Sequence, residues 1–297
     1  MGGLLDGKVS FITGAGRGQG RCHAVRQAAE GAKIIALDIC EDIASNPYPM
    51  ASADDLAETK ELVEQTGSEC VTFKGDVRNP AELREAVAKG LERFGRLTTV
   101  CANAGIMPMA MGDPNPMDFQ DALEVDLCGV INTVSASLPH VLQAGREGSI
   151  IVTGSIAALI PNTTSGTLDP RQIMGPGGAG YTLAKTSLVR YTEELALHIA
   201  PYGVRANIVH PTNCNTHLMN SDGVYMSFRP DIEGVPTKED FRPASEFFHA
   251  LPIPWIEPED VADLVFFFAS DESKNITGTS VGVDAGCMIK WPNGPGQ

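Results

Sequence analysis

Short apolar runs rich in β-branched residues alternate with segments of helical pattern along almost the whole sequence. The runs occupy residues 8–13, 33–38, 70–77, 97–105, 149–155, 204–211 and 279–286. They are nearly continuous in apolar residues, which is typical of strands buried on both faces of a parallel sheet. Because helical segments separate them, the sequence predicts an α/β fold with helices on both faces of the sheet.

Nothing in the composition divides the chain. Its 297 residues contain no internal repeat and no linker-like stretch, so we expect one domain over residues 1–297. Three segments are longer than such a fold needs: residues 40–53, 156–177 and 217–254. Loops of this length usually cover a site or are disordered. We interpret residues 40–53 as a cofactor-covering insertion, residues 156–177 as a loop insertion and residues 217–254 as a substrate lid.

The charged residues, cysteines and histidines limit the partners and the cellular location that we expect for this protein. The 37 acidic residues outnumber the 22 basic ones, which argues against a nucleic-acid partner. Seven scattered cysteines form no C-x-x-C pair, and the six histidines show no metal-ligand spacing. No leader opens the chain, and the densest apolar run, residues 264–269, is too short to span a bilayer. We expect a soluble cytoplasmic protein with no metal and no membrane partner.

A glycine-rich turn follows the first expected strand. Residues 13–20 read TGAGRGQG and lead into a helical pattern. Such a turn is often only a tight connection, but it also brings backbone N–H groups and a helix N-terminus close to a pyrophosphate. Asp38 closes the second strand, where an acid accepts the ribose hydroxyls of NAD and repels the 2′-phosphate of NADP. NAD is therefore the favoured cofactor, although Arg17 is placed to attract that phosphate.

A tyrosine and a lysine form the candidate chemical site. Tyr181 and Lys185 are four residues apart in a helical pattern, so their side chains share one face about 5–6 Å apart at Cβ. The pair is also common by chance. A phenol has a pKa of about 10, and a nearby ammonium would help it act as a base near neutral pH. Ser155 ends the fifth strand and either caps the chain there or donates to a substrate oxygen.

Together these motifs resemble a classical short-chain dehydrogenase/reductase. The resemblance covers about residues 5–290 and implies a doubly wound, mostly parallel, seven-stranded Rossmann-like sheet, commonly in a homotetramer, that moves hydride between a nicotinamide and an alcohol or ketone. Tyr181 is then the acid/base, Lys185 lowers its pKa and holds ribose, Ser155 binds the substrate oxygen, and Thr216 contacts the carboxamide. The implied cofactor-binding residues are Gly14, Arg17, Gly18, Gln19, Gly20, Asp38, Ile39, Asp76, Val77, Asn103, Ala104, Gly105, Tyr181, Lys185, Pro211, Asn213 and Thr216.

Four segments narrow the resemblance to the actinobacterial carveol dehydrogenase group, which is associated with the redox peptide cofactor mycofactocin. They are GRGQGR (16–21), DICEDIASNPYP (38–49), HPTNCNTHLMN (210–220) and LPIPWIEPEDVADLV (251–265). The resemblance implies a hydrophobic cyclic alcohol or ketone substrate of terpenoid shape. It also implies that the insertion holds NAD tightly and that an external, mycofactocin-type acceptor takes the electrons.

The sequence departs from the family pattern at two places. Asp126 stands where the family places Asn in N-x-x-G, and we count it among the catalytic candidates. Its charge would weaken Tyr181 as a base if it pairs with Lys185, and would be harmless if backbone N–H groups hold it. The second departure is the 26-residue spacing from Ser155 to Tyr181, which is longer than in most relatives and leaves the substrate open.

Three functions are compatible with these residues. The first is an NAD-dependent oxidoreductase acting on a secondary alcohol or ketone. The second is a non-catalytic NAD-binding redox sensor or scaffold, which only Asp126 supports. The third is a sugar-nucleotide epimerase, which also uses a Tyr–Lys pair but has a longer C-terminal segment. Intact Ser155, Tyr181 and Lys185 favour the first.

Overall fold

The computed structural model describes residues 2–109, 115–160 and 175–290. Within them, seven strands form one sheet in the order β3-β2-β1-β4-β5-β6-β7, and every neighbouring pair is parallel. The predicted seven-stranded sheet is confirmed, and it is entirely rather than mostly parallel. The strands are β1 Val9–Thr13, β2 Lys33–Asp38, β3 Cys70–Lys74, β4 Thr99–Ala102, β5 Ser149–Thr153, β6 Arg205–Pro211 and β7 Ser280–Val283.

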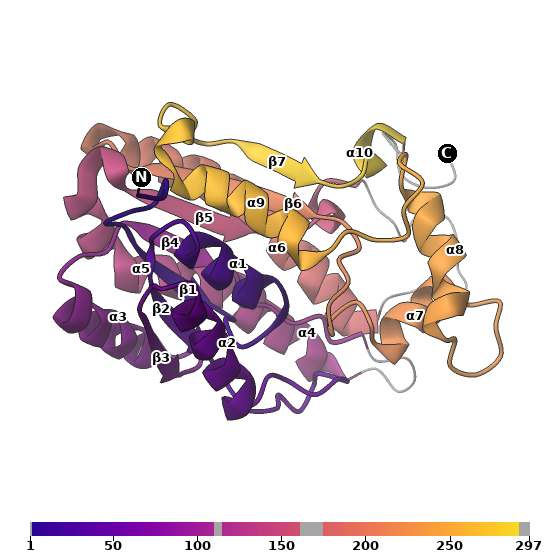
Figure 1. Ribbon diagram of the computed structural model, residues 1–297. Helices are drawn as coiled ribbons and strands as arrows, with labels where there is room; N and C mark the ends of the chain where they lie inside the picture. The colour runs from indigo at the N-terminus through magenta and orange to yellow at the C-terminus, as the bar shows by residue number, and fades with distance from the viewer. Residues whose placement is uncertain (1, 110–114, 161–174, 291–297) are drawn as a thin grey trace.

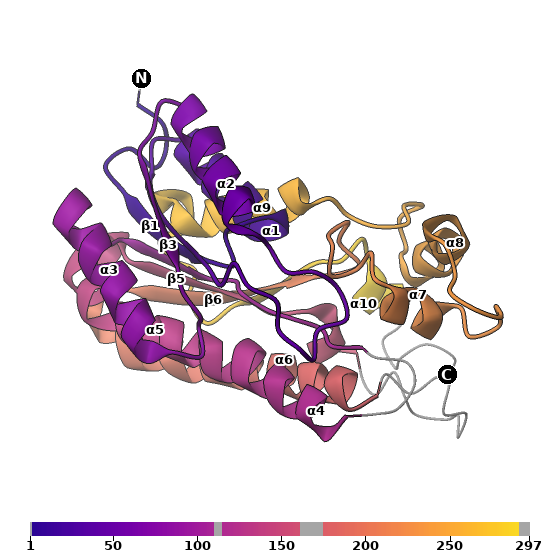
Figure 2. The same cartoon turned by 90° about the horizontal axis from the view of Figure 1, so that it is seen from below.

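Helices cover both faces of the sheet (Figures 1 and 2). One layer consists of α1 (Gly18–Ala28), α2 (Ala53–Gln65) and α9 (Pro258–Ala269). The opposite layer consists of α3 (Pro80–Phe94), α4 (Pro116–Leu123), α5 (Gly129–Val141) and α6 (Gly175–Ile199). A π-helical turn, η1 (Glu124–Cys128), joins α4 to α5. The expected helices on both faces are confirmed.

Strand geometry explains why the sheet is apolar on both sides. Neighbouring residues of a strand point to opposite faces, so Phe11 and Ile35 enter one hydrophobic cluster while Ile12 and Ile34 enter the other. All four side chains are fully buried. The continuous apolar runs seen in the sequence therefore supply two cores, one under each helical layer.

The two ends of α3 lie at the residues that the local sequence favours for a helix start and a helix end. Asn79 caps α3 by accepting the Ala81 N–H, and Pro80 occupies the first helical position. Gly95 ends the helix with a left-handed φ of 78°. These residues suit those positions because a cap needs a side-chain acceptor and the C-terminal turn needs a residue without a Cβ.

The order of the strands creates a crevice at the carboxyl edge of the sheet. The chain passes from β1 outward to β2 and β3, then returns to the other side of β1 with β4. Ligands of open α/β sheets bind outside the strand ends at such a reversal. The short helices α7 (Asp222–Phe228), α8 (Lys238–Phe248) and α10 (Cys287–Lys290) lie beyond this edge, toward which β7 points in Figure 1.

The long segments take different forms. Residues 217–254, which the sequence presented as a long loop, carry α7 and α8, because Thr237 and Asp240 form a capping box that starts α8. Residues 40–53 contain no strand and reach helix α2 only at Ala53. Most of the 156–177 insertion lies outside the described residues; its first part forms a short 3₁₀ turn, η3 (Ile156–Ala158).

One helical run has the length and hydropathy that a membrane span requires. It covers Pro116–Glu147, and half of its most apolar window is buried inside the protein. Within this run α5 packs against α3, β4 and β5. A core helix passes the same test, so the run is weak support for a membrane location.

Candidate active site

The glycine turn lies at the crevice between β1 and β4. Gly14 has a φ of 67°, and a Cβ there would lie 2.8 Å from the Cα of Ala104. A Cβ on Gly20 would overlap the carbonyl oxygen of Gly14. The turn therefore folds this tightly only with glycine at these two positions, which leaves their backbone open to the crevice.

The first turn of α1 is suited to an anion. Its N-cap, Arg17, is extended and makes no side-chain cap, so no capping oxygen occupies the first N–H groups. Free N–H groups and the helix dipole attract phosphate. The Arg17 guanidinium instead donates to the carbonyl oxygen of Pro49 in the insertion.

Asp38 ends β2 beside this turn and is 6% exposed. Its Oδ2 accepts the Gly16 N–H at 2.8 Å and its Oδ1 accepts the Cys40 N–H at 3.3 Å. Burial raises the pKa of Asp38, and these N–H groups and Arg17 partly oppose the rise. Both carboxylate oxygens thus have backbone donors at the place where a ribose would bind.

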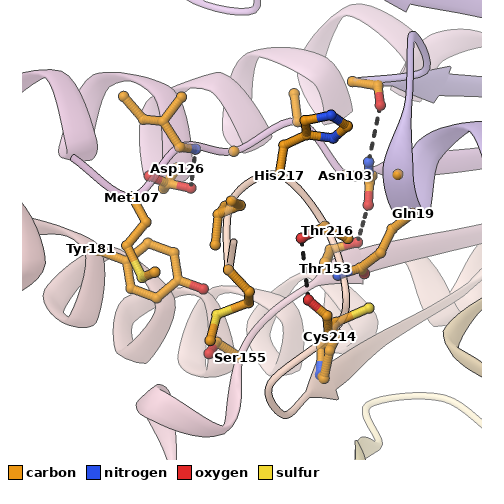
Figure 3. Close-up of a pocket in the computed structure, with 18 of the residues that line it drawn as sticks. Gln19, Asn103, Met107, Asp126, Thr153, Ser155, Tyr181, Cys214, Thr216 and His217 are labelled. Atoms are coloured by element: carbon orange, nitrogen blue, oxygen red, sulfur yellow. Dashed lines mark hydrogen bonds between the residues drawn. The ribbon is translucent and has the colours of Figure 1, made fainter. Parts of the chain in front are cut away.

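Every residue that the sequence assigns to cofactor binding or catalysis lines one cavity of about 550 Å³. Figure 3 shows Gln19, Asn103 and Thr216 toward one end, and Tyr181, Ser155 and Met107 toward the other. The glycine-rich turn, the open helix N-terminus and the buried acid at one end fit a dinucleotide.

Helix α6 brings Tyr181 and Lys185 to the other end; they are 9% and 3% exposed. The Lys185 ammonium donates to the carbonyl oxygen of Thr153 at 3.0 Å and lies 5.6 Å from the centre of the Tyr181 ring. Burial raises the pKa of Tyr181 above its usual value, Asp126 raises it further, and a hydrogen bond with Ser155 lowers it. The protein by itself therefore holds the phenol protonated.

Ser155 is fixed from behind by His210 at the end of β6. The Ser155 N–H donates to His210 Nδ1 at 3.1 Å, and His210 Nε2 lies 2.7 Å from the Ser280 hydroxyl. Burial lowers the pKa of His210 to about 4, which keeps the imidazole neutral. Ser155 Oγ accepts the Ala157 N–H at 3.2 Å, so its own hydroxyl proton can be donated into the cavity, where it interacts with Tyr181.

The family model described as Enoyl-(Acyl carrier protein) reductase, of the short-chain dehydrogenase type, matches residues 14–288. The chain belongs to the short-chain dehydrogenase/reductase family. It is 38% identical to a (-)-trans-carveol dehydrogenase of Rhodococcus erythropolis over 96% of this chain and 99% of the relative. A relative in Mycobacterium tuberculosis, described as an uncharacterized NAD-dependent oxidoreductase, is 35% identical over 97% of this chain and 98% of its own length.

Solved structures agree with this assignment. The chain superposes on a carveol dehydrogenase from Mycobacterium avium in complex with NAD with a TM-score of 0.88 and 40% identity, over 97% of this chain and 99% of that one. A short chain dehydrogenase from Mycobacterium paratuberculosis bound to NAD gives a TM-score of 0.82 and 37% identity, over 97% and 100% of the two chains. The predicted resemblance to the carveol dehydrogenase group of this family is confirmed.

In this short-chain dehydrogenase, Asp126 meets both conditions weighed from the sequence. Its Oδ1 lies 3.4 Å from Lys185 Nζ and also accepts the Ile106 N–H at 3.2 Å. Its Oδ2 has no hydrogen-bond partner among the described residues. Burial raises the pKa of Asp126 to about 7, and Lys185 and the Ile106 N–H oppose the rise. The carboxylate is paired with the lysine and only half satisfied.

Glycine at the start of α6 allows the helix to pack closely against the backbone of residues 107–109. A Cβ on Gly177 would overlap the carbonyl oxygen of Pro108, and one on Gly223 in α7 would overlap the carbonyl oxygen of Met109. The backbone at 107–109 is therefore held between α6 and α7. This close approach explains the glycine-rich stretch ahead of Tyr181.

The insertion contributes Tyr48, which sequence reasoning did not single out. Tyr48 lines the cavity, and its hydroxyl accepts the Met107 N–H at 3.3 Å. Burial raises the pKa of Tyr48, and both Asp126 and Tyr181 act on it electrostatically. The only local signal is an aromatic residue between two prolines, Pro47 and Pro49.

Residues 217–254 give this end of the cavity an apolar wall. Met107, Met109 and Tyr181 pack in one cluster with Val224, Tyr225 and Phe241, and Phe228 packs edge-on to Phe241 with ring centres 5.0 Å apart. Phe228, Phe248 and His217 also line the cavity. Phe228 lies in the stretch VYMSF (224–228), whose apolar residues indicate a pocket lining, whereas Phe248 on α8 was missed, because a short helix gives little periodic signal.

Metal chemistry has no support in the described part of the chain. No cluster of three or more His, Cys, Asp or Glu side chains suited to a metal ion occurs there. All seven cysteines are described, and all are free thiols.

Proposed function

We propose that this protein interconverts a secondary alcohol and a ketone, using tightly bound NAD and Tyr181 as the acid/base. The observation that carries the proposal is the meeting of Tyr181, Ser155 and Lys185 at one end of a cavity whose other end is a dinucleotide cradle. NAD is the cofactor, which agrees with the NAD-bound relatives of similar fold. When bound, NAD accepts a hydride from the alcohol or NADH returns one to the ketone.

The residues divide the chemistry between them. Ser155 donates its hydroxyl proton to the substrate oxygen, and Tyr181 removes the alcohol proton. Because the protein raises the pKa of Tyr181, the phenol needs cationic help to become a base. Lys185 supplies one positive charge, and the oxidised nicotinamide supplies another while it is bound. The alcohol proton therefore passes through Tyr181 most readily while the cofactor is oxidised.

We infer a hydrophobic, cyclic substrate of terpenoid shape, similar to carveol. Met107, Met109 and the lid residues Val224 and Phe228 surround the chemical end. Unbranched methionines adapt to irregular apolar ligands, and the aromatic rings give a broad flat wall. The carveol dehydrogenase relatives support the same class.

We further infer that residues 40–53 retain the cofactor, so that an external acceptor of the mycofactocin type regenerates NAD in place. Two clasps support this: Arg17 to the Pro49 carbonyl, and Tyr48 to the Met107 N–H. They fasten the insertion at both ends of the cavity. In a Tyr48→Phe variant, NAD should be lost faster during gel filtration than from the wild type, and equal retention would contradict the clasp.

We also propose a cytoplasmic homotetramer. The free thiols fit a reducing compartment. Leu183 and Leu197 on α6 are 49% and 69% exposed, an apolar exposure that a neighbouring subunit would cover. Light scattering of the purified protein tests the assembly, and a monomeric mass would contradict it.

A single-turnover experiment tests the reaction. Stoichiometric protein is mixed with carveol-like cyclic alcohols without an acceptor, and bound NADH is followed by fluorescence. Wild type should form NADH, and Tyr181→Phe should slow this about 10²–10⁴-fold while keeping its NAD. Tyr191→Phe is the matched control, because Tyr191 is on the same helix but does not line the cavity. No NADH from any alcohol, with NAD bound, would favour a redox sensor or scaffold.

A further inference from the structure

Asp126 and Lys185 form a buried pair that the hydride transfer does not itself require. Their exposed fractions are 0% and 3%. The ammonium is already held by the Thr153 carbonyl, and the carboxylate keeps Oδ2 without a partner among the described residues. A buried carboxylate with an unpaired oxygen is costly in its ionised form, and less so once protonated. Asp126 is therefore built to hold a proton as readily as a charge.

Few neighbouring groups determine whether Asp126 is protonated or ionised. The titratable or charged groups facing Asp126 in the described structure are Lys185 and Tyr181 on α6 and Tyr48 on the insertion. None of them approaches Oδ2 within hydrogen-bonding distance. The remaining charge that changes at this end of the cavity is that of the nicotinamide, which is positive when oxidised and neutral when reduced. Loss of that positive charge favours the neutral carboxyl.

We propose that Asp126 takes up one proton when the bound cofactor becomes reduced and releases it when the cofactor is oxidised again. The proposal rests on the proposed function, in that NAD is the resident cofactor. Oxidation of the alcohol moves its C–H hydrogen with the bonding electron pair to NAD⁺, giving NADH and the ketone. Its O–H proton leaves through Tyr181 and remains on Asp126. The summed charge of the site is then the same before and after the reaction.

Asparagine, which the family resemblance places at this position, stays neutral at every pH and cannot hold that proton. Asp126→Asn is therefore the natural test, since it keeps an oxygen toward the Ile106 N–H and nearly the same shape. Asp118→Asn is the matched control. Asp118 is a buried acid on α4, 4% exposed, and it does not line the cavity.

The first measurement needs no substrate. Full-length protein stripped of cofactor is titrated with NAD⁺ and with NADH by calorimetry in two buffers of different ionisation enthalpy, at about pH 8, where the proton linkage is read from the buffer difference. NADH should take up close to one proton more than NAD⁺ in wild type and Asp118→Asn, and none in Asp126→Asn. Equal uptake of protons with both cofactors, or a difference that persists in Asp126→Asn, overturns the proposal.

A second measurement uses the holoenzyme. During single-turnover oxidation of a cyclic alcohol, a pH indicator counts the protons released for each NADH formed. Wild type should release close to none and Asp126→Asn close to one. Full release from wild type, with NADH formed, overturns the role of Asp126 and leaves the proposed function standing. No NADH formed, with the calorimetric difference present, rejects the alcohol dehydrogenase function and leaves the proton uptake standing.

Discussion

The two ends of the cavity are built from different parts of the chain. At the nucleotide end, the backbone of a glycine turn, a helix N-terminus and the end of β2 form the surface, and the buried acid Asp38 has a backbone donor on each oxygen. At the chemical end, side chains from α6, the insertion and the lid form the surface, and the buried acid Asp126 has one oxygen unsatisfied. Asp38, with a hydrogen-bond donor on each oxygen, is held in place to bind a ligand. Asp126, with one oxygen lacking a donor, is suited to gain or lose a proton.

The largest effect is expected where the backbone itself forms the site. Gly20→Ala should remove bound NAD altogether and destabilise the fold by about 1–3 kcal/mol, because the new Cβ overlaps the Gly14 carbonyl. NAD content after purification and chemical denaturation measure this. Gly234→Ala is the control for lost stability alone: its φ of 89° strains any side chain, but it lies in open space outside the cavity, so NAD should stay bound. Bound NAD in Gly20→Ala would show that the nucleotide end is not rigid.

The next prediction concerns the chemical end and is measured as the dependence of protein stability on pH. The pKa of His210 is about 4 in the fold against about 6.5 unfolded. The unfolded chain thus binds the proton more readily, so stability is present above pH 6.5 and is lost as pH falls toward 4, by up to about 3 kcal/mol. Denaturation of His210→Gln at several pH values should give a shallower loss than wild type. Parallel curves for the two proteins would contradict a neutral His210 behind Ser155.

A third test separates the two ends directly. Phe228→Ala removes an aromatic wall of the chemical end and leaves the nucleotide end untouched. The single-turnover efficiency with a cyclic alcohol should fall about 10–100-fold while NAD content stays the same. Tyr202→Ala, an aromatic that is 61% exposed and outside the cavity, is the control. Loss of NAD from Phe228→Ala would mean that the ends are not independent.

The smallest effect concerns cofactor choice. Asp38→Asn keeps an acceptor at the end of β2 but removes the charge that repels a 2′-phosphate. The preference for NAD over NADP should fall by roughly tenfold, about 1.4 kcal/mol, as measured by binding both cofactors to the stripped protein. Glu41→Gln, an exposed acid paired with Lys74, should leave the ratio unchanged. An unaltered ratio in Asp38→Asn would assign the discrimination to another residue.

The same division explains how much the sequence could predict. Strands, the ends of α3 and the nucleotide residues follow from local rules: an apolar run, a capping Asn79, a terminating Gly95, a polar residue at a strand end. Parallel topology then brings those strand ends together. Tyr48 and Phe248 could not be found this way, because their positions depend on the path of an irregular insertion and on how two short helices pack.

Asp126 could be predicted from the sequence only in part. Its nearness to Lys185 followed from the family pattern, yet the balance between ion pair and backbone hydrogen bond depends on distances of 3.4 and 3.2 Å that no spacing encodes. The unsatisfied Oδ2 is likewise a property of packing.

The grip of Gly177 and Gly223 on the backbone at 107–109 has a mechanical consequence. Neither glycine has room for even a methyl group. The backbone at 107–109 is therefore in direct contact with α7 on one side and with α6, the helix that carries Tyr181, on the other. A substrate bulky enough to displace α7 must also push on the first turn of α6. Molecular size would then be sensed through the stiffness of the polypeptide as well as through the volume of the cavity.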